Sequence, residues 1–139
     1  MEITVRRAEP FDALPPGVAR QLSEDLLESK RRDGAILLAM VRGQPVGWLV
    51  HTLLWARVPF IELLHVEPDD RRLGVAAALL SALEDQQRAH GRELLLSSAQ
   101  DDNAAAMSWH LELGFDESGV IGGINAGGVG EVFFRKDLA

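Results

Sequence analysis

The feature that most constrains this chain is the stretch Ile61–Leu80, which reads IELLHVEPDDRRLGVAAALL. It starts with apolar residues that suit a buried strand, turns at Pro68–Asp70 and continues into a helix of small and aliphatic residues. The first N–H groups of a helix have no intrahelical partner, and the helix dipole favours negative charge at that end. A strand, loop and helix of this kind predict an anion site, and we expect it to hold a diphosphate.

Individual residues of this loop suit the close approach of a phosphate. Gly74 lets the backbone come near a ligand, while Ala76 and Ala77 keep bulky side chains away. Arg71 and Arg72 add positive charge in a geometry that matches phosphate oxygens.

Length and composition narrow the class of protein. The 139 residues predict a single domain over 1–139. The absence of cysteine excludes disulfides, cysteine metal ligands and a thiol nucleophile, and we expect no metal. The net charge of −7 argues against a nucleic-acid partner. Without an apolar run of about 18 residues or a hydrophobic signal core, we expect a cytoplasmic protein and no membrane contact.

Periodicity and turn residues predict seven strands and three helices. The expected strands are 2–8, 35–41, 45–54, 60–66, 93–98, 115–121 and 130–136. The expected helices are 17–32, 73–89 and a third that Asp101 or Asp102 caps and Gly114 ends, with a short helical turn at 11–14. Turns are expected at 42–44 and 56–59. The order predicts an α/β domain with a mixed, mostly antiparallel sheet, in which helix 73–89 connects the parallel strands 60–66 and 93–98.

Two motifs resemble those of one family. Arg71–Ala76 resembles the Gln/Arg-x-x-Gly-x-Gly/Ala signature of the GNAT superfamily of acyl-CoA-dependent N-acetyltransferases, and Leu64–Pro68 is similar to the lead-in of that signature. Asn103–Ala106, followed by Leu113–Phe115, is similar to the second motif of the family. Either motif alone is a weak signal, whereas both in order and at suitable spacing are a strong one.

The resemblance implies a fold and a cofactor. It implies a single-domain GNAT-like fold with helices on both faces of the sheet and with strands 60–66 and 93–98 splayed apart. The diphosphate of acetyl-CoA would lie on backbone amides of the loop, and pantetheine would pair with the first of these strands. The residues implied in cofactor binding are Leu64, His65, Val66, Arg71, Arg72, Leu73, Gly74, Val75, Ala76, Asn103 and Ala106.

The implied reaction transfers the acetyl group of acetyl-CoA directly to a primary amine in a ternary complex, because no cysteine is present to form an acyl-enzyme. A backbone N–H of the splayed strand would stabilise the oxyanion. The alternative is a non-catalytic acyl-CoA-binding regulatory module on the same fold. A plain nucleotide-binding domain is excluded because the chain carries neither a Walker loop nor a dinucleotide fingerprint.

Glu62 is the candidate general base. Counting alternate residues places it on one face of its strand with Phe60, Leu64 and Val66. Related enzymes often carry a glutamate here that acts through water. The alternative is that Glu62 pairs with an arginine or lies in a solvated part of the sheet.

His110 is the candidate acid. The family usually places a tyrosine five residues before the phenylalanine of its Leu-Gly-Phe motif, and here His110 precedes Phe115 by five in a chain without tyrosine. An imidazolium, with a pKa of about 6.5, can donate a proton. The alternative is a helix residue that contacts cofactor or solvent and has no proton role. His65 points to the other face of its strand and is expected to pack or to form hydrogen bonds.

The sequence does not identify the acceptor amine, because polyamines, aminoglycosides, amino acids or a peptide amine all suit an acidic chain. The tryptophans Trp48, Trp55 and Trp109 either line an acceptor pocket or pack in the core. The glycine-rich segment Gly122–Gly130 is expected to be a mobile hairpin loop. A homodimer through the last strands is a further expectation, with Val129–Phe134 as an apolar edge.

Overall fold

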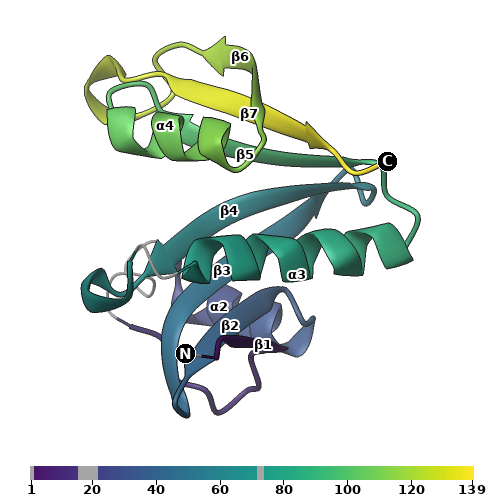
Figure 1. Ribbon diagram of the computed structural model, residues 1–139. Helices are drawn as coiled ribbons and strands as arrows, with labels where there is room; N and C mark the ends of the chain where they lie inside the picture. Colours follow the sequence, from purple (N-terminus) through teal and green to yellow (C-terminus); the bar gives the residue numbers. More distant parts are fainter. Residues whose placement is uncertain (1, 16–21, 72–73) are drawn as a thin grey trace. The chain divides into compact units, whose positions relative to one another are not determined.

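The computed structural model describes residues 2–15, 22–71 and 74–139 (Figure 1). Within them, seven strands form one mixed sheet in the order β1-β2-β3-β4-β5-β7-β6. The strands are β1 Thr4–Arg7, β2 Ile36–Val41, β3 Gln44–Leu54, β4 Val58–Val66, β5 Leu94–Gln100, β6 Asp116–Ile121 and β7 Glu131–Asp137. The helices are α2 Glu24–Arg32, α3 Val75–Ala89 and α4 Ala104–Glu112, with short 3₁₀ turns at Pro68–Asp70 and Ala126–Gly128. The predicted α/β fold and element order are confirmed, including the parallel pairing of β4 with β5, in which Phe60 lies opposite Leu96.

The chain divides into two compact units. Unit 1 comprises Met1–Thr52 and Glu62–Gln86, and unit 2 comprises Leu53–Ile61 and Gln87–Ala139. The strand β4 contributes its first residues to unit 2 and Glu62–Val66 to unit 1. Among the candidate site residues, Glu62, Leu64 and Gly74 belong to unit 1, and Asn103 and His110 belong to unit 2.

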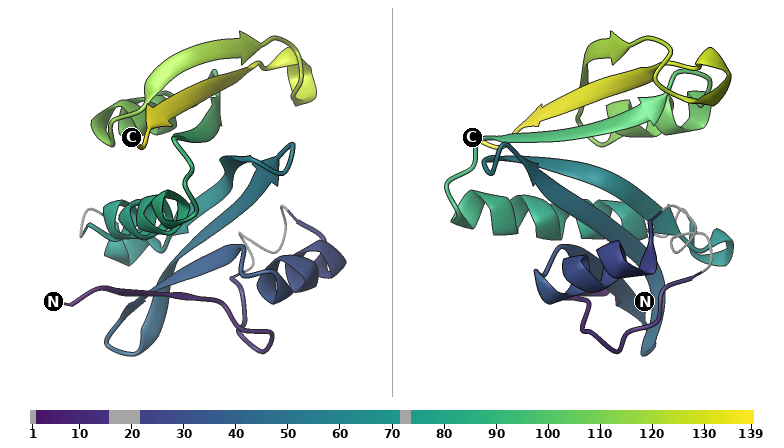
Figure 2. Two further views of the ribbon diagram at one scale, coloured as in Figure 1. Left: turned by 90° about the vertical axis from the view of Figure 1, so that its right-hand side faces the viewer. Right: turned by 180° about the vertical axis from the view of Figure 1, so that it is seen from behind.

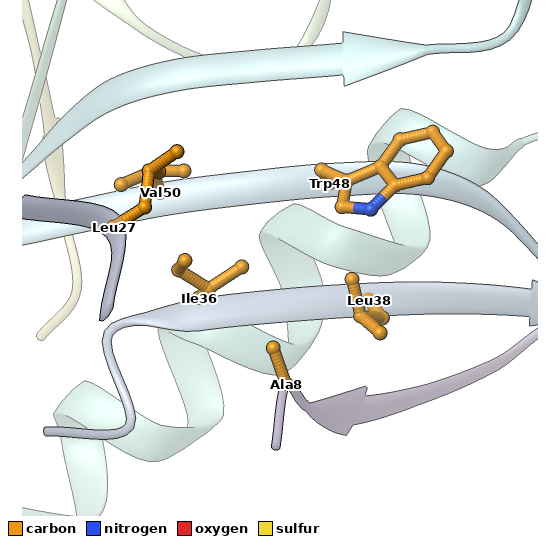
Figure 3. Close-up of a cluster of buried hydrophobic side chains, with 6 residues drawn as sticks. All are labelled: Ala8, Leu27, Ile36, Leu38, Trp48 and Val50. Carbon is orange, nitrogen blue, oxygen red and sulfur yellow. The ribbon is translucent and has the colours of Figure 1, made fainter. Parts of the chain in front are cut away.

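In unit 1, helices α2 and α3 lie on opposite faces of the strands (Figures 1 and 2). On the α2 face, six buried side chains form a core cluster, drawn in Figure 3: Ala8, Leu27, Ile36, Leu38, Trp48 and Val50. On the α3 face, a Cβ added at Gly47 would lie 2.7 Å from Val75 Cγ1 and 3.0 Å from Leu79 Cδ1. The absence of a side chain at Gly47 therefore lets the first turns of α3 approach β3 closely.

The start of α2 differs from the prediction. The helix begins at Glu24, after Ser23, whose hydroxyl accepts a hydrogen bond from Leu26 N at 3.3 Å. The prediction placed the start at 17 from apolar periodicity, whereas the helix starts after the serine cap. Residues 17–21 lie outside the described part of the chain. The helical turn expected at 11–14 is also wrong, because the chain makes only a turn there, in which Asp12 N donates to Glu9 O at 2.9 Å.

Two hairpin turns contain residues at positive φ, one between β2 and β3 and the other between β3 and β4. Arg42 and Gly43 have φ of 52° and 76°, the positive values that a two-residue type I′ turn requires. Between β3 and β4 the turn is Trp55–Arg57, one residue earlier than expected, with Trp55 and Ala56 both at positive φ. Val58 and Pro59 consequently belong to β4.

In unit 2, β7 lies between β5 and β6, and α4 packs on one face of these strands (Figure 2). The prediction that Val129–Phe134 forms an edge is wrong, since β7 pairs with β5 on one side and with β6 on the other. The edge is β6, whose residues are all exposed. Sheet order depends on tertiary pairing, which local periodicity does not report.

The residue that caps α4 differs from the prediction. Asn103 caps the helix through Oδ1, which accepts from Ala106 N at 3.0 Å, whereas Asp101 accepts from Gly130 N at 3.1 Å. The buried residue of α4 is His110, whereas Leu111 is 59% exposed. Phe115 packs back on the helix, with its ring centroid 5.4 Å from that of His110.

Candidate functional site

The candidate base contacts a lysine of α2. Lys30 Nζ lies 2.5 Å from Glu62 Oε1 and donates to the carbonyl oxygen of His51 at 3.1 Å. The lysine is buried, and the Glu62 side chain is 23% exposed. Glu62 therefore forms an ion pair, as the alternative to a catalytic role predicts, but its partner is a lysine and not an arginine.

The residues that follow Glu62 on β4 contact the core cluster at alternate positions. Leu63 packs against the core cluster on the α2 face, and the ring of His65 lies 5.9 Å from that of Trp48 in the same cluster. Glu62 itself reaches α2 through Lys30. The placement of Glu62 on one face of its strand with Phe60, Leu64 and Val66 stays a prediction.

The other strand residues of the candidate cofactor site are half-buried. Leu64, His65 and Val66 form the end of β4 in unit 1. The Nε2 atom of His65 is 3.8 Å from Glu67 Oε1, and its ring packs beside Trp48 as expected. The carbonyl oxygen of Val66 accepts a hydrogen bond from Arg71 Nε at 3.0 Å, so Arg71 closes the turn that leads out of the strand.

Gly74 is the residue that leads into α3. Gly74 has φ of 84°, a conformation that favours glycine, and its carbonyl accepts the first helical hydrogen bond from Ala78 N at 2.9 Å. The N–H groups of Val75, Ala76 and Ala77 therefore precede the first intrahelical bond. The described first turn of α3 carries no acidic residue. Arg72 and Leu73, both predicted to bind the cofactor, lie outside the described residues.

The surroundings of Gly74 are open. A Cβ built at this position would meet no heavy atom within 4 Å. Glycine is therefore favoured here by its backbone angle, and a Cβ would meet no steric barrier from the described residues.

In unit 2, the candidate residues share α4. Asn103 is the cap, Ala106 is half-buried in the first turn, and His110 is 3% exposed in the last turn. His110 Nδ1 lies 2.7 Å from the carbonyl oxygen of Ala106, and Nε2 lies 2.7 Å from Ser97 Oγ. Its ring stacks on Phe134 at a centroid distance of 4.4 Å.

These contacts define the protonation of His110. A carbonyl oxygen can only accept, so Nδ1 carries the hydrogen, and Nε2 then accepts the hydrogen of the Ser97 hydroxyl. Burial lowers the pKa of His110, which favours the neutral ring. In this state both ring nitrogens are already engaged, and the ring has no free proton to give.

The buried His51 makes stability depend on pH. Its Nε2 is buried without a hydrogen-bond partner among the described residues. Burial, followed by the charges of Lys30 and Arg7, lowers the pKa of His51 from 6.5 to about 4. The folded state therefore binds this proton less tightly than the unfolded state between these two values. Lowering the pH through this window destabilises the fold, and the lowered pKa of His110 acts in the same direction.

We expect the free energy of unfolding to fall by about 2 kcal/mol between pH 7 and pH 5 through His51. His51→Leu should remove this part of the slope, because leucine has no proton to bind. Urea denaturation of both proteins at the two pH values measures it. An unchanged slope in His51→Leu would contradict the account.

Sequence reasoning missed two partners of the candidate residues. Lys30 stands three residues after the buried Leu27, on the same side of the helix, and this spacing could have indicated its burial. Ser97 lies in the predicted strand 93–98 and is buried beside His110. The three tryptophans differ in their surroundings. Trp48 is a core residue, Trp55 is 76% exposed, and the ring of Trp109 lies edge-on to that of His110.

The described part of the chain contains no group of three or more His, Cys, Asp or Glu side chains that could hold a metal. None of its helices is both long and apolar enough to cross a membrane.

The structure is an α/β fold in which Gly74, at positive φ, precedes helix α3. The Acetyltransferase (GNAT) family profile matches residues 5–115. The chain belongs to this family of acyltransferase enzymes, which confirms the resemblance inferred from the two motifs.

Individual relatives agree with the family. Aminoglycoside N(6')-acetyltransferase type 1 of Klebsiella aerogenes is 31% identical over 105 residues, which cover 70% of this chain and 69% of that protein. An uncharacterized N-acetyltransferase of Methanocaldococcus jannaschii is 27% identical over 100 residues, 68% of this chain but only 44% of that protein. A GNAT acetyltransferase of Elizabethkingia anophelis, solved with acetyl-CoA bound, has a TM-score of 0.82 at 13% identity and covers 97% of each chain.

Proposed function

We propose that this protein transfers the acetyl group of acetyl-CoA directly to a primary amine in a ternary complex. The observation that carries the proposal is the start of α3, where Gly74 at positive φ precedes three N–H groups for which the described residues supply no intrahelical acceptor. The diphosphate of acetyl-CoA accepts hydrogen bonds from these groups, and the arginines of the loop add positive charge.

The remainder of the cofactor site follows the family pattern. Pantetheine lies along β4 near Leu64 and Val66. The carbonyl oxygen of Val66 is already bonded to Arg71, so the N–H groups of this segment are the better candidates to bind pantetheine and to stabilise the oxyanion. On α4, Asn103 and Ala106 are the residues proposed to contact the other end of the cofactor.

The reaction requires one proton to leave the acceptor before attack. Glu62 takes a proton from the acceptor ammonium through a water, and the amine nitrogen then attacks the thioester carbon. The tetrahedral intermediate loses a second proton from nitrogen as the C–S bond breaks. CoA leaves as a thiolate and is protonated by solvent, so that the products are the amide, CoA and one proton. His110, buried and engaged at both nitrogens, is not needed as the acid in this scheme.

The acceptor is proposed only as a primary amine. The Klebsiella aerogenes relative is named for an aminoglycoside acceptor. The chain covers only 44% of the Methanocaldococcus jannaschii relative. A panel of aminoglycosides, polyamines, amino acids and peptides with free amino termini, incubated with acetyl-CoA and read out as free CoA, tests the proposal. Release of CoA that depends on one amine class is expected.

A second function has specific support. Glu62 is paired with Lys30, and His110 has no free proton, so an acyl-CoA-binding regulatory module would also fit these residues. This function predicts acetyl-CoA binding with no amine-dependent release of CoA across the whole panel. Absence of binding would exclude both functions.

We also propose a homodimer that forms through β6. This edge strand exposes unpaired backbone groups together with Val120 and Ile121, which are 56% and 47% exposed. Light scattering after size-exclusion chromatography should give twice the chain mass, and Val120→Lys should give the monomer, because a charge on an edge strand opposes pairing. A monomer at every concentration would contradict the dimer.

A further inference from the structure

Helix α2 buries a charge as well as an apolar residue. Leu27 and Lys30 are its buried residues, and the Lys30 residue is only 8% exposed. A buried ammonium costs free energy unless it is paired and hydrogen-bonded, and an apolar residue of similar size commonly stabilises a fold at least as well. The contacts of Lys30 therefore call for an explanation other than stability.

The ammonium group of Lys30 is anchored on the backbone. It donates to the carbonyl oxygen of His51 at 3.1 Å, and the N–H of His51 is in turn bonded to Ala35 O at 3.0 Å. The position of Nζ is thus set by β3 and by the chain that enters β2, and both lie in unit 1 with Glu62.

The same ammonium group holds one oxygen of the proposed base. Lys30 Nζ contacts Oε1 of Glu62 at 2.5 Å. The nearby His51 ring is neutral at pH 7, because burial lowers its pKa to about 4, so it does not compete as a second cation for this carboxylate. Fixing Oε1 orients the carboxylate and leaves Oε2 for a water or for the acceptor ammonium.

We propose that Lys30 is a positioning residue, which holds Glu62 through Oε1 so that Oε2 receives the proton of the acceptor amine. This inference rests on the proposed acetyl transfer. It predicts that Lys30 acts on the rate through Glu62, and that it has little influence on the binding of acetyl-CoA.

The test compares Lys30→Met, Lys30→Arg, Glu62→Gln and the double variant Lys30→Met/Glu62→Gln, with the amine found in the panel. Lys30→Met should lower kcat roughly 10- to 100-fold, the effect of a misplaced catalytic group, while KM for acetyl-CoA changes less than about twofold. Lys30→Arg keeps the charge and should recover most of the loss. In the Glu62→Gln background, Lys30→Met should change kcat less than about twofold, because residues that act as a unit are not additive.

Unit 2 offers a matched control in Lys136, whose Nζ also donates to a backbone carbonyl, that of Leu113, at 2.8 Å. Lys136→Met should leave kcat within about twofold, since no positioning role is assigned to it. If Lys30→Met does not fold, the double variant, which removes both charges, and Lys30→Arg still decide the question.

Three results would overturn the inference. The first is an unchanged kcat in Lys30→Met, and the second is a further loss when Lys30→Met is added to Glu62→Gln. The third is a Lys30→Arg variant as slow as Lys30→Met. A wild-type protein that transfers acetyl to no amine would overturn the proposed function itself, and this is read from the wild type alone.

Discussion

Replacing Glu62 by glutamine is expected to lower kcat by about 100- to 10,000-fold, the usual contribution of a general base. An amide cannot accept the proton that the acceptor ammonium must lose, whereas its size and shape remain close to those of the carboxylate. The affinity for acetyl-CoA should change less than about threefold, because this side chain is not among those proposed to bind the cofactor. Steady-state kinetics with the acceptor amine and isothermal titration with acetyl-CoA measure the two quantities.

The matched control for this substitution is Glu93→Gln, at an exposed position just before β5. It removes the same charge from the chain but should leave kcat within about twofold, as surface substitutions usually do. If Glu62→Gln keeps its full rate, or loses rate and cofactor affinity equally, the assignment of Glu62 as base is wrong.

The second large effect is expected at Gly74. Gly74→Asn should weaken acetyl-CoA binding by at least about 100-fold, because a side chain would occupy the open space over the loop into which the diphosphate must come. Asparagine tolerates positive φ better than most residues, so the loop should keep its backbone conformation. Isothermal titration with acetyl-CoA measures the affinity, and thermal unfolding verifies that the protein is folded.

Gly43→Asn is the control for this prediction. Gly43 also has positive φ, 76°, and a Cβ there also meets no atom within 4 Å, but it lies in the turn between β2 and β3. The two variants share the same chemical change and the same backbone demand. Equal affinities for acetyl-CoA in Gly74→Asn and Gly43→Asn would show that the space over Gly74 is not the cofactor site.

The elements of the fold could be predicted because their signals are local. The glycine turn at Arg42–Gly43, the cap region before α4 and the glycine after it each depend on a few adjacent residues. Which of several adjacent residues takes a given role could not be predicted in the same way. Asp101, Asp102 and Asn103 all suit a helix cap, and a distant contact between Asp101 and Gly130 leaves that role to Asn103.

The site was predicted in part for the same reason. The loop before α3 is a continuous motif, so Gly74 and its neighbours could be read from the sequence. The partners of the proposed catalytic residues come from elsewhere in the chain: Lys30 is 32 positions from Glu62, and Ser97 is 13 positions from His110. Burial of His110 depends on Phe134 in β7, and no local pattern reports such a contact.

The most direct test of the account is a crystal structure of this protein with acetyl-CoA. The account predicts that diphosphate oxygens lie within about 3.2 Å of the backbone nitrogens of Val75 and Ala76, the distance of a hydrogen bond. It also predicts that the thioester lies next to β4 in the segment Glu62–Val66. A diphosphate bound away from the start of α3, with these N–H groups in contact with water, would contradict the central claim.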